Sequence, residues 1–180
     1  THADGTADYH WTLRADGTKV TSSYDVKGRI LSSVALEADG DTLSQTFDPL
    51  SGKPTKTVLT EADGDVVTTL YTAGIVTSLY KDNADGAKLS QFFDAKGVIT
   101  SANLQAADGH VEASLYTGGV LSKLFVTNPD KSQVNSVYNI AGKSYVTEVQ
   151  KFDPSGKIVD ILRTHADGTA DYHWTLRADG

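Results

Sequence analysis

Five histidines are the residues of this sequence best suited to acid–base or metal chemistry, and four of them belong to its two ends. His2 and His10 recur as His165 and His173, and only His110 is unique. There is no cysteine and no HExxH or GxSxG motif. Such spacings are the usual sequence signals of a transition-metal site or a nucleophilic serine. The sequence therefore predicts that the chain is not an enzyme and has no catalytic or transition-metal residues.

Aspartate recurs at one position of a repeated turn, the tripeptide Ala-Asp-Gly. Calcium needs six to eight oxygen ligands, and one carboxylate per turn supplies too few unless neighbouring turns cooperate. Calcium is thus the one cofactor that the sequence leaves open, with Asp82 and Asp85 of the run DNADG as weak candidates. The favoured alternative is that each carboxylate accepts a backbone hydrogen bond and shapes its turn. The aspartates of this turn family are Asp4, Asp16, Asp39, Asp63, Asp85, Asp108, Asp167 and Asp179.

The segment DYHWTL, at Asp8–Leu13 and again at Asp171–Leu176, contains both tryptophans of the chain. Successive side chains of a strand point to opposite faces, so we expect Tyr and Trp of this segment to point to both faces and at least one of them to be exposed. The alternative is that Trp11 packs into the junction between two repeat blocks. The predicted contact surface consists of Tyr9, His10, Trp11, Tyr172, His173 and Trp174.

Two families of turns alternate along the chain and must position these residues. From Gly17 to a degenerate copy at Asn128–Lys131, the Ala-Asp-Gly turns recur every 22 to 24 residues. Their composition is typical of a three-residue hairpin loop with a bulge. Midway between them lie turns that begin with Tyr or Phe, usually followed by Asp and closed by Gly. They begin at Tyr24, Phe47, Tyr71, Phe93, Tyr116, Tyr138 and Phe152.

The segments between turns are rich in Val, Thr, Ser, Leu and Tyr, which favours strands. Short connections require consecutive strands to be antiparallel neighbours. The fold class predicted is all-β: an antiparallel meander of repeated β-hairpins, in units of about 23 residues, forming one continuous, twisted or coiled sheet, a β-solenoid-like repeat array. We expect about fifteen strands, and one longer strand over Lys143–Asp153, where no Ala-Asp-Gly turn occurs.

Both faces of the predicted sheet carry apolar residues. One face has an aromatic column at Tyr24, Phe47, Tyr71, Phe93, Tyr116 and Tyr138, which could stack on sugars but is more typical of cross-strand packing. On the strand that follows the turn at Tyr24, counting every second residue puts Ile30 and Val34 on one face. We expect both faces to be covered, either by coiling of the sheet or by a second layer.

The first seventeen residues, Thr1–Gly17, are repeated without a mismatch at Thr164–Gly180. Neighbouring 23-residue units share a pattern but little sequence identity. The exact match of the two ends therefore indicates a second, longer repeat rather than another copy of the 23-residue unit. We expect residues 1–163 to be one long block and residues 164–180 to be the start of the next. The alternative is a deliberate duplication that supplies an end cap. The chain has no Met, which indicates a piece of a longer protein.

Composition excludes several partners. The net charge is −7, so there is no basic surface for nucleic acid or for anionic lipid. No apolar run is long enough to cross a bilayer, so we expect no membrane insertion. A meander fragment has unpaired edge strands, which predicts end-to-end self-association.

The sequence resembles a known type of repeat. YDVKGRI at Tyr24–Ile30 and FDPSGKI at Phe152–Ile158 resemble the YD (Rhs-type) repeat, which forms β-hairpins in large secreted bacterial proteins. The run Val137–Gly168 is similar to repeats of large type-I-secreted, RTX-type proteins. The resemblance departs from the YD pattern at Tyr71 and Tyr116, where Thr follows the aromatic residue.

We therefore expect a structural segment, a stalk or scaffold, of a large secreted or surface-exposed bacterial protein, for which adhesion is a further role. Its partners would be neighbouring repeat blocks of the same protein and a surface glycan. The alternative is a carbohydrate-binding module that uses the exposed aromatic residues, and an enzyme ranks last.

Overall fold

The computed structural model describes residues 1–176 apart from 2 and 4, and these residues form strands, turns and loops without a helix. Contacts divide the chain into two units, Thr1–Gly97 and Val98–Gly180. The first contains β1 (Tyr9–Leu13), β2 (Lys19–Tyr24), β3 (Ile30–Leu36), β4 (Thr42–Phe47), β5 (Pro54–Thr60), β6 (Val66–Thr72), β7 (Ile75–Asp82) and β8 (Lys88–Phe93). The second contains β9 (Ile99–Gln105), β10 (Val111–Thr117), β11 (Val120–Thr127), β12 (Gln133–Val137), β13 (Thr147–Phe152), β14 (Ile158–Thr164) and β15 (Ala170–Thr175).

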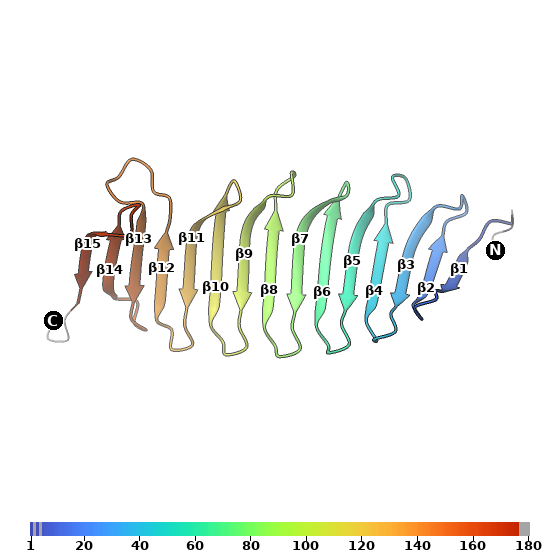
Figure 1. Ribbon diagram of the computed structural model, residues 1–180, viewed down its shortest axis with the longest axis horizontal. Coiled ribbons are helices and arrows are strands. Elements are labelled where there is room, and N and C mark those ends of the chain that lie inside the picture. The colour runs from blue at the N-terminus through green and yellow to red at the C-terminus, as the bar shows by residue number, and fades with distance from the viewer. Residues whose placement is uncertain (2, 4, 177–180) are drawn as a thin grey trace. The chain divides into compact units, whose positions relative to one another are not determined.

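Within each unit, every strand pairs antiparallel with its neighbours in sequence (Figure 1). The prediction of an all-β meander of antiparallel hairpins is confirmed. The prediction of one longer strand over Lys143–Asp153 is wrong, because β13 begins only at Thr147. A loop precedes it, in which Asn139 and Gly142 take left-handed backbone conformations and the Ile140 amide donates to the Val146 carbonyl.

The Ala-Asp-Gly turns are the three-residue loops that their composition predicts. At the turn between β3 and β4, the Gly40 amide donates to the Glu37 carbonyl and the Glu37 amide donates to the Asp41 carbonyl. Gly40 has φ 100°, a conformation that costs a residue with a Cβ about 1 kcal/mol or more. The Asp39 carboxylate accepts the Asp41 amide at 3.1 Å. Aspartate therefore caps the turn, as the favoured alternative expects.

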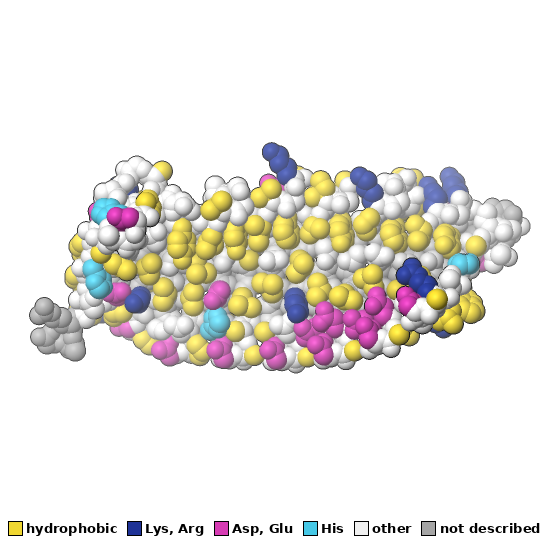
Figure 2. Space-filling view, viewed as in Figure 1, with side chains coloured by type: hydrophobic (Ala, Val, Ile, Leu, Met, Phe, Trp, Pro, Cys, Tyr) yellow, Lys and Arg dark blue, Asp and Glu magenta, His cyan; other side chains and the backbone are white. Residues whose placement is uncertain are grey.

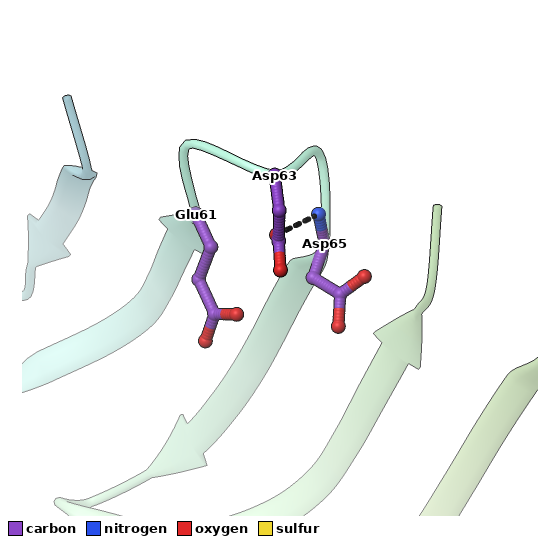
Figure 3. Close-up of side chains that lie close together, drawn as sticks. All are labelled: Glu61, Asp63 and Asp65. Carbon is purple, nitrogen blue, oxygen red and sulfur yellow. Dashed lines mark hydrogen bonds between the residues drawn. The ribbon is translucent and has the colours of Figure 1, made fainter. Parts of the chain in front are cut away.

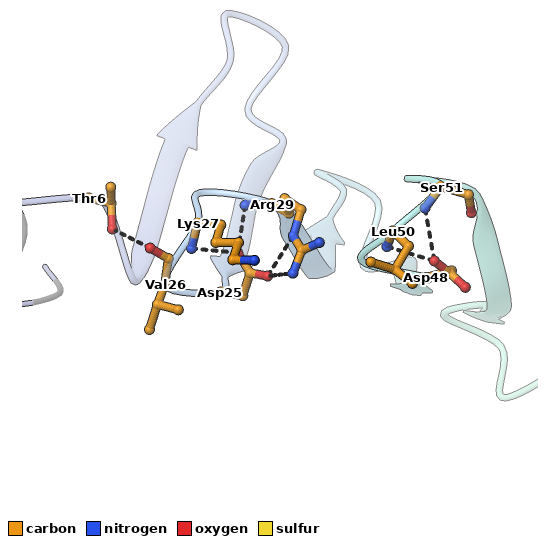
Figure 4. Close-up of polar contacts among 8 residues, drawn as sticks. All are labelled: Thr6, Asp25, Val26, Lys27, Arg29, Asp48, Leu50 and Ser51. Carbon is orange, nitrogen blue, oxygen red and sulfur yellow. Dashed lines mark hydrogen bonds and ion pairs between the residues drawn. The ribbon is translucent and has the colours of Figure 1, made fainter.

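The Tyr/Phe-Asp turns are loops held by their aspartate (Figure 4). Asp25 Oδ1 accepts the amides of Lys27 and Arg29, each at 2.9 Å, and its Oδ2 accepts Arg29 Nε at 2.8 Å. In the next such turn, Asp48 Oδ1 accepts the amides of Leu50 and Ser51. The hydrogen bond from the Arg29 side chain lowers the pKa of Asp25 to about 2.

A β-bulge beside the aromatic residue of these turns changes which residues share a face. The register shifts beside the aromatic residue in β2–β3, β4–β5, β6–β7, β10–β11 and β13–β14. In β2–β3, Tyr24 lies opposite Ile30 and Ser23 lies opposite Ser32, so Leu31 is the extra residue. Val34 consequently faces Thr21 and lies on the sheet face opposite to Tyr24 and Ile30. The expectation that Ile30 and Val34 share a face is wrong, because it counted residues without the bulge.

Each unit is a single layer of strands. Among the described residues no strand contacts another that is not its neighbour in sequence, and no side chain is less than 2% exposed. The most buried residues are small ones such as Ser78, Ser136 and Ala87. Neither unit therefore contains the second layer that the apolar faces led us to expect. Hydrophobic side chains instead form bands across the strands (Figure 2), where cross-strand pairs such as Tyr24–Ile30 and Tyr71–Val76 shield one another.

The short turn between β6 and β7 provides a stability test. Ala73 and Gly74 have φ 53° and 84°, as in a two-residue type I′ turn. Asn tolerates this conformation better than Ala. We expect Ala73→Asn to stabilise the chain by about 0.5–1 kcal/mol in a denaturant titration. Ala84→Asn is the matched control, since Ala84 is not in the left-handed region. An equal gain in stability from both variants would contradict the assignment of Ala73–Gly74 to a type I′ turn.

Acid should destabilise the fold through the turn aspartates. Their pKa values are lowered in the folded chain, chiefly by hydrogen bonds from turn residues, at Asp16, Asp25, Asp48, Asp108, Asp130, Asp153 and Asp167. A lowered folded pKa adds stability that is present above the unfolded value, about 3.9, and is lost as the pH falls through the folded value.

We therefore expect the melting temperature, followed by far-UV circular dichroism, to be nearly constant above about pH 5 and to fall steeply between about pH 4 and pH 2. Asp25→Asn should melt lower at neutral pH and show a shallower fall in acid. A melting temperature that rises on acidification would contradict this account.

Candidate functional site: the duplicated terminal strand

The predicted contact surface lies on the outermost described strand of each unit, β1 and β15 (Figure 1). In β1, Tyr9, Trp11 and Leu13 lie on one face, opposite Ser23, Thr21 and Lys19 of β2. The side chains of Tyr9 and Trp11 are each 58% exposed. His10 points to the other face, where its Nδ1 lies 3.4 Å from Thr12 Oγ1. The structure therefore brings Tyr9 and Trp11 together and separates His10 from them.

The second copy, β15, is more firmly held. Tyr172 lies opposite Arg163 and Trp174 opposite Ile161, and their exposed fractions are 43% and 38%. The Arg163 guanidinium lies over the rings of Tyr145 and Tyr172, 4.9 and 5.3 Å from their centres. These distances are those of cation–π contacts. Identical aromatic residues are thus less exposed at β15 than at β1.

Charged groups on and beside β14 complete this end of the unit. Arg163 Nε donates to Glu148 Oε2 at 2.6 Å, and this bond lowers the pKa of Glu148. On the opposite face, Asp160 Oδ1 lies 2.9 Å from both His173 Nε2 and Thr175 Oγ1. Burial raises the pKa of Asp160, but hydrogen bonds from Thr175, His173 and Lys151 outweigh it, and the pKa is lowered. His173 therefore anchors β15 and does not join Tyr172 and Trp174 on their face.

The weak calcium candidates have other partners. Asp82 Oδ1 lies 3.1 Å from Lys88 Nζ across β7 and β8, and Asp85 Oδ1 accepts the Ala87 amide at 2.8 Å. The other turn aspartates accept backbone amides in the same way at Asp16, Asp39, Asp63, Asp108 and Asp167. Asp4 and Asp179 lie outside the described residues.

A different acidic group forms at the turn between β5 and β6 (Figure 3). Carboxylate oxygens of Glu61, Asp63 and Asp65 lie within 4.8 Å of one another. Asp65 is already paired, since its Oδ2 lies 2.8 Å from Lys81 Nζ and its Oδ1 accepts the Ala84 amide. The Lys81 side chain lowers the pKa of Asp65. The run EADGD, at 37–41 and 61–65, is the sequence signal for this group. The expectation of one carboxylate per turn overlooked the acidic residues on either side of Ala-Asp-Gly.

The exit aspartates of these turns connect one turn to the next. Asp41 Oδ1 accepts the amide of Ala62, and Asp65 Oδ1 accepts the amide of Ala84, each at 2.9 Å. Figure 2 shows acidic side chains gathered along this edge of the first unit. The arrangement is that of a repeated structural contact between turns, with Lys81 as its counter-charge.

Two open grooves lie beside the short turns. One, of about 300 Å³, is lined by Ile75, Phe93 and Ala95 among others, and the other, of about 420 Å³, by Val120 and Tyr138 among others. Each forms because a two-residue turn projects less far than the longer loop that follows it. The replacement of the Asp-x-x-Gly loop after Tyr71 and Tyr116 is the sequence signal for these grooves.

Comparisons with known proteins assign no family. No family model matches the chain, and no curated protein matches it. Among solved structures, the chain is similar to a porin-like protein from Bacteroides uniformis ATCC 8492, at 11% identity and a TM-score of 0.25. The alignment covers 93% of this chain and 91% of that chain. The described residues include no helix long and apolar enough to span a membrane.

Proposed function

We propose that the chain is a structural tandem-repeat segment, a stalk or scaffold, of a large secreted or surface-exposed bacterial protein. The observation that carries the proposal is that every described strand contacts only its neighbours in sequence within its unit. Such an architecture lengthens by adding units, because each unit buries surface only against the next. The resemblance to YD-type and RTX-type repeats supports the bacterial, secreted setting and an adhesive role.

The duplicated strand supports the same proposal. The terminal strand β15 repeats β1 and pairs with the strand before it, whereas β1 pairs with the strand after it. A continuing array would give this strand both neighbours. Its partners would then be the neighbouring blocks of the same protein.

A two-block chain, residues 1–163 followed by 1–180, tests the proposal. We expect an unfolding enthalpy about twice that of the single chain, and a melting temperature above that of two chains joined by a flexible Gly/Ser linker. The linker chain is the control, because it contains the same blocks without the continuous junction. An unfolded second block, or a melting temperature no higher than that of the linker chain, would contradict the proposal.

A carbohydrate-binding module is the second candidate, and the exposure of Tyr9 and Trp11 on one face favours it. Aromatic rings displayed side by side can stack on sugar rings. A pull-down with insoluble polysaccharides should then retain the chain and lose it on Trp11→Ala with Trp174→Ala. Retention of the double variant would exclude these side chains as the sugar contact.

A further inference from the structure

The two copies of the terminal strand use opposite edges. β1 pairs through one edge with β2, and no other strand of its described unit pairs with it. β15 pairs with β14, the strand that precedes it. In a meander the preceding and following strands lie on opposite edges. In the part of the chain that the structure describes, each copy therefore leaves open the edge that the other copy uses.

Backbone hydrogen bonds identify the residues on each edge. The Tyr24 amide donates to the Asp8 carbonyl, and alternation along an antiparallel ladder then directs the amides of His10 and Thr12 toward β2. The Leu176 amide donates to the Val159 carbonyl, so the amides of Trp174 and Tyr172 are directed toward β14. The amide of His173, which corresponds to His10, is consequently directed to the open edge of β15.

We propose that β15 of one molecule pairs with β2 of a second molecule, in the place of that molecule's β1. This strand exchange rests on the proposed function, because it recreates between two chains the junction that a continuing array would contain. Sequence identity fixes its register: Tyr172 opposite Ser23, His173 opposite Ser22 and Trp174 opposite Thr21, as Tyr9, His10 and Trp11 are now. The partner is a second copy of this chain.

Side-chain contacts indicate which of the two copies, β1 on β2 or β15 on β14, separates more easily from its neighbouring strand. Both strands are exposed, but Tyr9 and Trp11 are each 58% exposed against 43% and 38% for Tyr172 and Trp174. Tyr9 reaches β2 through one side-chain hydrogen bond of 3.3 Å to Thr21 Oγ1. β15 is held by Arg163 over Tyr172 and by Asp160 with His173 and Thr175. β1 is therefore the strand that is displaced, and β15 is the strand that docks while it stays on β14.

Simple addition of β15 to the open edge of β1 is geometrically poorer. Because the two strands have the same sequence, joining their open edges with the same face outward makes them parallel, which is the less stable pairing. An antiparallel pair would turn the Tyr172–Trp174 face of one molecule to the opposite side from Tyr9 and Trp11 of the other. Exchange keeps the pair antiparallel and keeps the faces aligned. Its contact is head-to-tail, so it extends into open chains of molecules.

Matched proline substitutions test the exchange, with sedimentation velocity over a dilution series of the full chain. His10→Pro removes an amide that holds β1 on β2, so it opens the docking position, and association should strengthen about tenfold or more. His173→Pro removes the equivalent amide from the open edge of β15 and spares the amides directed toward β14. This variant should stay monomeric at concentrations where the wild type associates.

Alanine variants separate the amide from the imidazole. His10→Ala keeps the backbone donor and should associate within about threefold of the wild type. His173→Ala loses the contact with Asp160 but keeps its amide, so it should associate more strongly than His173→Pro. A wild type that is monomeric at every concentration, or a His10→Pro variant that associates more weakly, would overturn the exchange. Association that His10→Pro leaves unchanged and His173→Pro abolishes would indicate edge addition instead. None of these results depends on the two-block chain, so the exchange can fail while the proposed function stands.

Discussion

Removal of one whole hairpin unit, residues 41–64, should leave a folded chain. The deletion joins Gly40 to Asp65 and recreates the run EADGD at the new turn. β3 then pairs with β6, and Val34 meets Thr68 where it now meets Ser44. Asp65, which already binds the Ala84 amide, replaces Asp41 as the exit aspartate. Because each strand contacts only its neighbours, no other contact of the unit is lost.

We expect the deleted chain to keep its far-UV circular dichroism per residue and to melt within about 5 °C of the full chain. A deletion one residue shorter, residues 43–65, is the matched control. It shifts the register by one and turns the side chains that follow to the wrong faces. It should therefore be severely destabilised. Equal loss of structure in both deletions would show that the strands depend on contacts beyond their neighbours.

Proline at the centre of a ladder should have the largest effect of any single substitution. Val58 lies in β5, paired with Ser44 on one side and Thr68 on the other. Val58→Pro removes a ladder hydrogen bond and disturbs the strand, which we expect to cost about 2 kcal/mol or more. With no second layer to hold β5 in place, the damage should open the sheet locally.

Ala95→Pro is the control for this substitution. The turn FDAKG at Phe93–Gly97 is similar to FDPSG at Phe152–Gly156, where Pro154 already follows the aspartate. This proline should be neutral or stabilise by up to about 1 kcal/mol. Denaturant titrations of both variants provide the comparison. A Val58→Pro chain as stable as Ala95→Pro would contradict the described ladder.

The meander and its turns could be predicted from sequence because their signals are local. Ala-Asp-Gly supplies an acceptor and a residue that tolerates positive φ within three positions, as Asp39 and Gly40 show. The spacing of such turns then leaves room only for strands. Tyr9 and Trp11 are two residues apart and share a face of β1, so the expectation that they point to opposite faces is wrong.

Features that depend on contacts between turns or on backbone irregularity could not be predicted in this way. The bulge beside Tyr24 leaves Leu31 without a partner in β2. Val34 therefore lies on the face opposite to Ile30, although counting by twos along β3 places both on one face. The contacts of Arg163 with Tyr145 and Tyr172 join three separate segments. The single layer was missed because apolar residues on two faces usually indicate a cover, whereas here cross-strand pairs shield them only in part.

Hydrogen–deuterium exchange of the wild-type chain at high dilution, followed by mass spectrometry of its peptides, tests the central claim most directly. If each strand is held only by its neighbours, the terminal strand β1 should exchange fastest in the first unit and β4 to β6 slowest, with a gradual change between them. The same slow exchange in β1 and β5, through one cooperative opening, would contradict the account, because it would require a shared core that the described contacts do not contain.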